Sequence, residues 1–450
     1  SGLGPYLQAL VFRVIPDAGD RLAALQAGAV QGADNMPWSS VPLAAADLNL
    51  RVSWRPALNT GYLGINRAHP PLDNPLVRQA IAHALDKAAI VSSHYNQDAP
   101  GGQVATQLLP PAQWGRDEAL VDYDYDPAEA EALLADAGYG GGLHTTLWVL
   151  PVTRLYLPNA LDLALSMQED LNSVGISTTL ITEYDWATYL TKVADGEADL
   201  FMLGWGGDNG HPDNFFYPLL CDQYQRYGPR DDALCAALDS ARVEEDLTMQ
   251  LATYEWSSRR VHETLPLVPI GHSRTALFFR ENVGGFVPGP LASESFGPVF
   301  LASDWVEVVA DTAATLVYTD AQGSETVVEV PAGATVDPIT LLYAPLDGAA
   351  DVAAGFYAGH GFVLEAYSSG ELLSDLAFEV PIVVTLYYTD ADVAGVDEES
   401  LTLRYWDGLA WSSDGITVVE RDTAGNRLVV TLAHLSEFRL LARGEHEAHL

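Results

Sequence analysis

The sequence predicts an α/β lobe followed by an all-β sandwich domain. Up to about residue 304, helical patterns alternate with short apolar runs, and this alternation is typical of an α/β lobe. From residue 315 onward helical periodicity disappears, and short runs rich in Val, Thr, Leu and Tyr alternate with turns. Short strands at this spacing are typical of a β-sandwich. We therefore expect one domain over residues 1–304 and a second over residues 305–450.

Helix signals in the first domain are explicit. The Asn-Pro pair at 74–75 and the Asp-Pro pair at 126–127 each combine a capping side chain with a proline suited to the first helical position. A longer helix is predicted from about residue 160, and Gly175 ends it. The β-branched run at 176–181 predicts a strand directly after that helix.

Eight short strands are predicted in the second domain. Turn-forming segments rich in Gly, Asp and Asn separate them, and such residues favour hairpins. The predicted strands are residues 315–319, 325–330, 340–343, 362–367, 381–388, 401–406, 416–420 and 428–432.

The segment GWGGDNGHPDNFF at residues 204–216 is the strongest candidate for a functional loop. It follows an apolar run at 199–203 that predicts a buried strand, and its four glycines and proline disfavour regular structure. Trp205 offers a flat apolar face and Asp208 offers a carboxylate beside it, which together suit a ligand with a cationic amine. A plain surface turn after a strand is the alternative that composition leaves open.

Composition excludes several classes of partner. The chain carries a formal net charge of −39, and Lys87 and Lys192 are its only lysines. Phosphates would be repelled by such a chain, so nucleic acid and anionic lipid are not expected partners. Its apolar runs are far shorter than the roughly 20 residues that a membrane helix requires.

The two cysteines, Cys221 and Cys235, are 14 positions apart. Their spacing matches no zinc motif, and a lone histidine in the 204–216 loop, His211, is poor evidence for a metal site. A buried pair of free thiols and a disulfide both remain open, and an oxidising compartment favours the disulfide. The sequence also lacks serine nucleophile elbows, phosphate-binding loops and dinucleotide fingerprints. We therefore expect no cofactor, no metal and no enzymatic activity.

A collinear series of segments resembles one protein family over roughly residues 5–300. It includes NTGYLGIN at residues 59–66 and PLDNPLVRQAI at residues 71–81. The other segments are residues 12–17, 21–28, 126–127, 132–138, 151–159 and 204–216. Together they resemble the peptide/nickel-type, family 5 extracellular solute-binding proteins of ABC importers.

This resemblance implies a fold and a function. Residues 1–304 would form the C-terminal part of a type II periplasmic-binding-protein-like fold, with part of lobe I and lobe III, truncated at the N-terminus. The protein would act outside the cytoplasm, in the periplasm or at the cell surface. It would be a monomer that captures short peptides and presents them to an ABC permease in the membrane. The protein would close over the peptide by a hinge motion that the ligand favours, and it would catalyse no reaction.

The resemblance also implies site residues. Trp205 and Asp208 match the family's Trp-x-x-Asp pattern, whose carboxylate pairs with a peptide's α-ammonium group. Arg154, in Pro-Val-Thr-Arg-Leu-Tyr at 151–156, matches the arginine that meets the peptide carboxylate, although Leu155 and Leu157 depart from the pattern. Asn209 is expected beside Asp208 in the substrate-binding loop. Relatives also carry a similarly placed bridge after this loop, which favours a disulfide between Cys221 and Cys235.

A second hypothesis places the function in the β-sandwich. Tyr405, Trp406 and Trp411 could form a stacking platform for sugars, which would make the protein a surface adhesion or carbohydrate-binding protein. Aromatic residues at strand spacing are more often part of a core. An exposed, coplanar pair of rings would favour this alternative, and burial would remove it.

Overall fold

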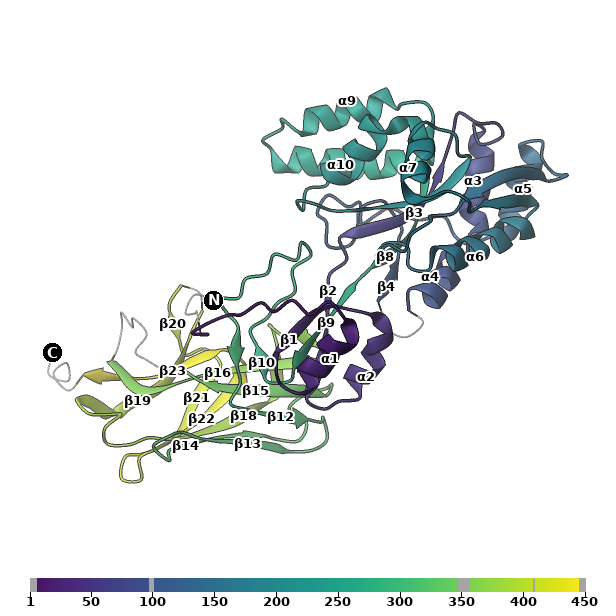
Figure 1. Cartoon of the computed structure of the whole chain (residues 1–450). Coiled ribbons are helices and arrows are strands. Elements are labelled where there is room, and N and C mark those ends of the chain that lie inside the picture. Colours follow the sequence, from purple (N-terminus) through teal and green to yellow (C-terminus); the bar gives the residue numbers. More distant parts are fainter. Residues whose placement is uncertain (1–5, 97–100, 347–355, 408, 445–450) are drawn as a thin grey trace. The chain divides into compact units, whose positions relative to one another are not determined.

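The computed structural model describes residues 6–96, 101–346, 356–407 and 409–444. The chain divides into two compact units. The α/β unit contains residues 55–276 and 289–293, and the β-rich unit contains the residues up to 54, residues 277–288 and those from 294 onward. Figure 1 labels the helices and strands of the chain.

A mixed sheet forms the centre of the α/β unit. Its strand order is β4-β8-β3-β7-β5-β6, with β7 antiparallel to β3 and parallel to β5. Every residue of β3 is buried, as expected for a central strand covered on both faces. The strands are β3 (Asn59–Ile65), β4 (Gly102–Val104), β5 (Leu143–Trp148), β6 (Ile176–Ile181), β7 (Leu200–Gly206) and β8 (Leu267–Ser273).

The helices of this unit begin where capping side chains allow. The Asn74 side chain accepts a hydrogen bond from the Leu76 amide, and Asp126 accepts from the amides of Ala128 and Glu129, so both predicted helix starts are confirmed. The helices are α3 (Pro75–Ala84), α4 (Lys87–His94), α5 (Pro127–Asp136), α6 (Ala160–Ser173), α7 (Trp186–Ala194), α8 (Asp213–Tyr217), α9 (Asp232–Ala241) and α10 (Leu247–Thr264). In Figure 1, α9 and α10 lie side by side, and the two helices are in contact.

The β-rich unit includes a small α/β portion. A sheet with the order β1-β9-β2 accompanies α1 and α2, and β10 pairs with β11 in a separate short ribbon. These elements are α1 (Ala18–Gln26), β1 (Gly32–Met36), α2 (Val41–Ala45), β2 (Leu50–Arg55), β9 (Thr275–Arg280), β10 (Val283–Gly284) and β11 (Phe300–Leu301).

Two antiparallel sheets form the predicted β-sandwich. One has the order β12-β15-β16-β23-β19-β20 with β17 on β16, and the other has the order β13-β14-β18-β22-β21. Each predicted strand overlaps an observed one, while β12, β23 and the two-residue strands β17 and β20 were not predicted. The strands are β12 (Asp304–Val308), β13 (Ala314–Thr319), β14 (Glu325–Val330), β15 (Ile339–Pro345), β16 (Phe356–Ser368), β17 (Glu371–Leu372), β18 (Ala377–Tyr387), β19 (Val396–Trp406), β20 (Trp411–Ser412), β21 (Ile416–Asp422), β22 (Arg427–His434) and β23 (Glu437–Gly444).

Strand β15 is buried on both of its faces. Leu341 and Tyr343 belong to the core between the two sandwich sheets, whereas Leu342 and Ala344 belong to a second cluster with Phe300. Because successive side chains of a strand point to opposite faces, this sheet has an apolar layer on each side. The second layer is made with residues from outside the sandwich.

This packing differs from the linear boundary predicted at residue 304. The residues up to 54 and residues 277–288 group with the sandwich and not with residues 55–276. The reason is the second apolar layer, which joins residues around 300 to the outer face of β15 and β16. The predicted boundary at residue 304 separates the solute-binding-protein-like segment from the appended sandwich, and it stays a prediction. The two compact units, which reflect contacts, do not follow this boundary.

Candidate functional site

The loop predicted to bind ligand begins at the end of β7, in the middle of the sheet. Trp205 is opposite Thr60 of β3 and is half-buried, while Asp208 and Asn209 are exposed. The Gly207 amide donates to the Leu58 carbonyl (2.7 Å), and the Gln113 side-chain amide donates to the Gly210 carbonyl (2.8 Å). The loop is therefore tied to the unit at both of these points while its acidic side chain faces solvent.

Asn214 connects Trp205 and Asp208, two of the three residues predicted from the sequence in this loop. Its side-chain oxygen accepts from the Trp205 indole nitrogen (3.2 Å) and from the Asp208 amide (2.9 Å). Its side-chain nitrogen donates to the Asp208 carboxylate (3.1 Å). The sequence analysis did not select Asn214, because its role depends on how the loop folds back on itself.

His211, within the loop, belongs to an aromatic cluster. Trp114 and Tyr254 each meet the His211 ring edge to face, with centroids 5.0 Å and 5.6 Å away. The His211 Nδ1 atom accepts from the Asp213 amide. Burial lowers the pKa of His211, so its imidazole is neutral at pH 7 and packs as an aromatic ring.

Arg154 lies on a second loop, between β5 and α6, that is clamped onto the sheet. The Ser273 hydroxyl donates to the Leu155 carbonyl (2.5 Å), and the Tyr95 hydroxyl donates to the Tyr156 carbonyl (2.8 Å). The Leu157 amide closes the turn by donating to the Arg154 carbonyl (3.1 Å). The backbone that carries Arg154 is thus fixed, and the Arg154 side chain is exposed.

The two loops meet at Gly204. A Cβ atom at this position would lie 2.2 Å from the Tyr156 ring and 2.7 Å from the Thr60 carbonyl oxygen, so a glycine is required for this contact. Gly204 precedes Trp205, and Tyr156 follows Arg154 by two residues. The loops with Arg154 and Asp208 therefore both begin at the carboxyl-terminal ends of the parallel strands β5 and β7. The structure therefore brings together the two segments that sequence reasoning selected.

Arg154 rests on an aromatic side chain. Its guanidinium carbon lies 4.7 Å from the centroid of Trp186, the first residue of α7, and Trp186 stacks on Tyr189. Such cation–π contacts stabilise a guanidinium without neutralising it. Among the described residues, neither Arg154 nor Asp208 forms an ion pair, so each keeps a net charge to offer a ligand.

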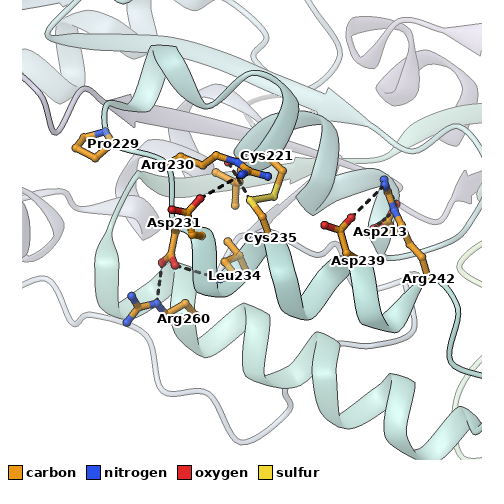
Figure 2. The surroundings of a disulfide bond; sticks show 12 residues. Asp213, Cys221, Pro229, Arg230, Asp231, Leu234, Cys235, Asp239, Arg242 and Arg260 are labelled. Carbon is orange, nitrogen blue, oxygen red and sulfur yellow. Dashed lines mark hydrogen bonds and ion pairs between the residues drawn. A yellow bond between two sulfur atoms is a disulfide. The ribbon is translucent and has the colours of Figure 1, made fainter.

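Asp213, in the same loop region, is bound differently. Its carboxylate accepts three hydrogen bonds from Arg242 at 2.8–3.1 Å (Figure 2). The Arg242 guanidinium also lies over the Tyr217 ring. Because this carboxylate is already paired, Asp213 is a structural residue. Asp208, in contrast, is exposed and has no cationic partner among the described residues.

The predicted disulfide between Cys221 and Cys235 is present, with Cα atoms 5.7 Å apart. It joins a π-helical turn at Pro218–Asp222 to α9 (Figure 2). Asp231 caps α9 through the Leu234 amide and pairs with Arg260 of α10 (2.7 Å). These contacts fix the position of the segment after residues 204–216, the candidate ligand loop.

The sandwich does not offer the sugar platform of the alternative hypothesis. The rings of Trp406 and Trp411 meet edge to face at 65°, with centroids 5.7 Å apart, and Tyr405 packs against the sandwich core. A flat stacking surface requires coplanar rings, so the condition set for this hypothesis is not met.

The described part of the chain shows neither a metal-ligand cluster nor a membrane-spanning helix. No group of three or more His, Cys, Asp or Glu residues there is arranged to hold a metal ion. The described helices also include none that is long and apolar enough to cross a membrane.

Comparison with known proteins identifies the family. Residues 2–226, half of the chain, match the family model described as bacterial extracellular solute-binding proteins, family 5, middle region. The chain belongs to this family. The chain is 35% identical over 300 residues to the dipeptide-binding protein of Escherichia coli K12, which covers 66% of this chain and 55% of that protein. The chain therefore spans about half the length of this relative.

Solved structures also match 64% of the chain. The structure of HbpA2 from Haemophilus parasuis is 34% identical, with a TM-score of 0.61, and covers 64% of this chain and 57% of that one. A dipeptide-binding protein from Pseudoalteromonas sp. SM9913 in complex with Met-Leu is 29% identical, with a TM-score of 0.53 and the same two coverages. The α/β fold predicted for this part of the family 5 chain is confirmed.

Proposed function

We propose that this family 5 chain binds short peptides by their two charged ends. Asp208 would pair with the α-ammonium group and Arg154 with the α-carboxylate. The observation that carries the proposal is the meeting of the two loops at Gly204, with an unpaired carboxylate on one loop and an unpaired guanidinium on the other. Relatives whose names state that they bind dipeptides support the same ligand class.

The charges are suited to this task. An ammonium group that leaves water needs an anionic partner, and a guanidinium can hold a carboxylate through two parallel hydrogen bonds. Trp205 would contribute an apolar surface to the ligand's side chain. The Asn209 side-chain oxygen accepts from the His211 amide (3.0 Å), which leaves the Asn209 amide group to donate to the peptide backbone.

Membership of the family supports a proposal for the cellular role. We propose that the protein works outside the cytoplasm as a monomer, catalyses no reaction and delivers its peptide to an ABC permease. Closure around the ligand would shift the protein toward the form that the permease recognises. The disulfide, which suits an oxidising compartment, supports this location.

Calorimetric titration of the 450-residue chain tests the ligand class. The probes are Met-Leu, its N-acetylated form and its C-terminally amidated form. We expect Met-Leu to bind best, and Asp208→Asn to weaken its binding by about 2–5 kcal/mol because a buried ammonium loses its charged partner. The same variant should leave the binding of the N-acetylated peptide nearly unchanged.

Arg154→Gln gives the complementary test. It should weaken Met-Leu much more than the amidated peptide, since the proposed partner of Arg154 is the carboxylate. Asp213→Asn, at a carboxylate already paired with Arg242, is the control and should change neither comparison. Absence of binding, or equal affinity for free and blocked peptides, would contradict the proposal.

A further inference from the structure

We infer that Asn214 is a positioning residue of the ligand site. It holds Asp208 and Trp205 in the geometry that binds the free amino group of a peptide. The inference rests on the proposed function, because it assigns a task to a side chain that would not itself touch the peptide. It is carried by three hydrogen bonds that converge on one amide group.

The orientation of the Asn214 amide is fixed by its neighbours. The Trp205 indole nitrogen and the Asp208 backbone nitrogen are donors and cannot accept, so the atom that faces both must be the oxygen. The side-chain nitrogen then faces the Asp208 carboxylate, where it donates. Both lone pairs of the oxygen are used, and the hydrogen-bonding pattern admits no flipped amide.

Only an amide of this length meets all three requirements. An aspartate at position 214 would put a second carboxylate about 3 Å from that of Asp208 and repel it. An apolar side chain of similar size would leave the indole N–H and the Asp208 carboxylate without this partner. The chemistry of the site therefore selects asparagine.

Asn214 is itself held by the core. It lies in α8, where its amide donates to the His211 carbonyl (3.1 Å), and the next two residues, Phe215 and Phe216, are fully buried. Because α8 packs into the core through these two residues, Asn214 is held in place and can fix the position of the exposed Asp208 carboxylate. One oxygen of Asp208 is taken by Asn214, and the other is left to meet the ligand.

This arrangement lowers the entropy cost of binding. A free aspartate side chain on a glycine-rich loop samples several rotamers, and a ligand would have to select one of them. Because Asn214 holds both the backbone amide and the carboxylate of Asp208, the acceptor oxygen is already in place. The same amide sets the plane of the Trp205 ring beside it.

The test uses Asn214→Leu in the full chain and measures two affinity ratios by calorimetry. The amine ratio compares Met-Leu with its N-acetylated form, and the carboxylate ratio compares Met-Leu with its amide. We expect the amine ratio to fall at least tenfold and the carboxylate ratio, which depends on Arg154, to stay within twofold. The Trp205 indole N–H resonance should move toward that of a solvent-exposed indole.

A purely structural role would give another pattern. Loss of stability alone would weaken the binding of every probe by the same factor and leave both ratios unchanged, and an unchanged amine ratio would overturn the inference. Asp213→Asn, the neighbouring substitution, touches neither Trp205 nor Asp208 and should leave both ratios unchanged. If leucine prevents folding, Asn214→Ser repeats the measurement with a shorter polar side chain that cannot span the three contacts.

The inference can fail independently of the proposed function. If the wild-type chain shows no preference for a free amine, the proposed function is wrong and the inference falls with it. If the wild-type chain has this preference and Asn214→Leu retains it, peptide binding stands and the positioning role is wrong.

Discussion

The guanidinium carbon of Arg51 lies 3.6 Å from the ring centroid of Tyr367. Arg51 is buried and also donates to the carbonyl of Glu281, while the Tyr367 hydroxyl donates to the Glu365 carboxylate (3.0 Å). The Gly285 amide donates to the same carboxylate (2.8 Å). Side chains of β2 and β16 thus share one buried polar network with residues 281–285.

Substitution of Arg51 is expected to destabilise the β-rich unit. Arg51→Met keeps most of the side-chain volume but leaves the buried carboxylates near it without their cation. Breaking a buried charge network in this way costs about 3–5 kcal/mol. Urea unfolding followed by far-UV circular dichroism measures the change. Arg443→Met, at an exposed arginine 3.8 Å from Asp397, is the control and should shift the midpoint little. Equal shifts for the two variants would contradict this account.

Acid should destabilise the α/β unit through His272. This residue is 1% exposed, its Nδ1 donates to the Asn59 carbonyl (2.8 Å), and burial lowers its pKa from 6.5 to about 4. Between these two values the unfolded chain binds a proton that the folded chain does not, so stability is present above pH 6.5 and is lost as the pH falls toward 4. The full contribution is about 3 kcal/mol.

A comparison of variants isolates that effect. The free energy of unfolding is measured at pH 7.5 and pH 5 for the wild type, His272→Gln and His144→Gln. We expect the pH dependence to be reduced by the first substitution and kept by the second, since His144 is exposed. An unchanged pH dependence in His272→Gln would assign the acid sensitivity to other groups.

Gly204 and Gly206 form a matched pair in one strand. An alanine Cβ at position 204 would overlap the Tyr156 ring and the Thr60 carbonyl, whereas at position 206 it would meet no atom within 4 Å. Overpacking of this kind costs about 1–3 kcal/mol, and a surface change is typically within 0.5 kcal/mol. We therefore expect Gly204→Ala, but not Gly206→Ala, to lower the thermal midpoint and weaken Met-Leu binding. Similar behaviour of the two variants would show that the loops do not depend on this contact.

The disulfide is expected to stabilise the segment after the ligand loop. Closing a loop between two positions 14 apart in sequence contributes about 3 kcal/mol in the chain-entropy model. Cys221→Ala combined with Cys235→Ala should lower the free energy of unfolding of the α/β unit by that amount. Thiol titration of unfolded, unreduced wild-type protein should find no free thiol, and two free thiols would rule out the bridge.

Local signals predicted most of the elements. The Asn-Pro and Asp-Pro pairs placed the starts of α3 and α5, and strand propensity placed β6 at residues 176–181. The candidate ligand loop was selected from its glycines and, through the family resemblance, from the Trp-x-x-Asp pattern, and its role in binding stays a prediction. These features depend on neighbours in sequence, which a single chain displays directly.

Long-range packing accounts for what sequence reasoning missed. The run Leu341–Ala344 is apolar throughout, but sequence alone does not reveal that Leu342 and Ala344 pack on Phe300 and not on the sandwich core. The role of Asn214 was also missed. The three groups that it binds, the Trp205 indole N–H and the amide and carboxylate of Asp208, come together only when the loop folds. The first miss is a contact between distant segments and the second depends on how one loop folds back on itself.

The burial of β15 on both faces bears on how this chain can evolve. A module joined by a linker can be exchanged between genes because its surface is already compatible with water. Here the outer face of β15 and β16 is apolar and is matched to Phe300 and to the buried Arg51. A recombination event at residue 304 would separate surfaces that fit each other, so the sandwich and residues around 51 and 300 must be inherited as a pair.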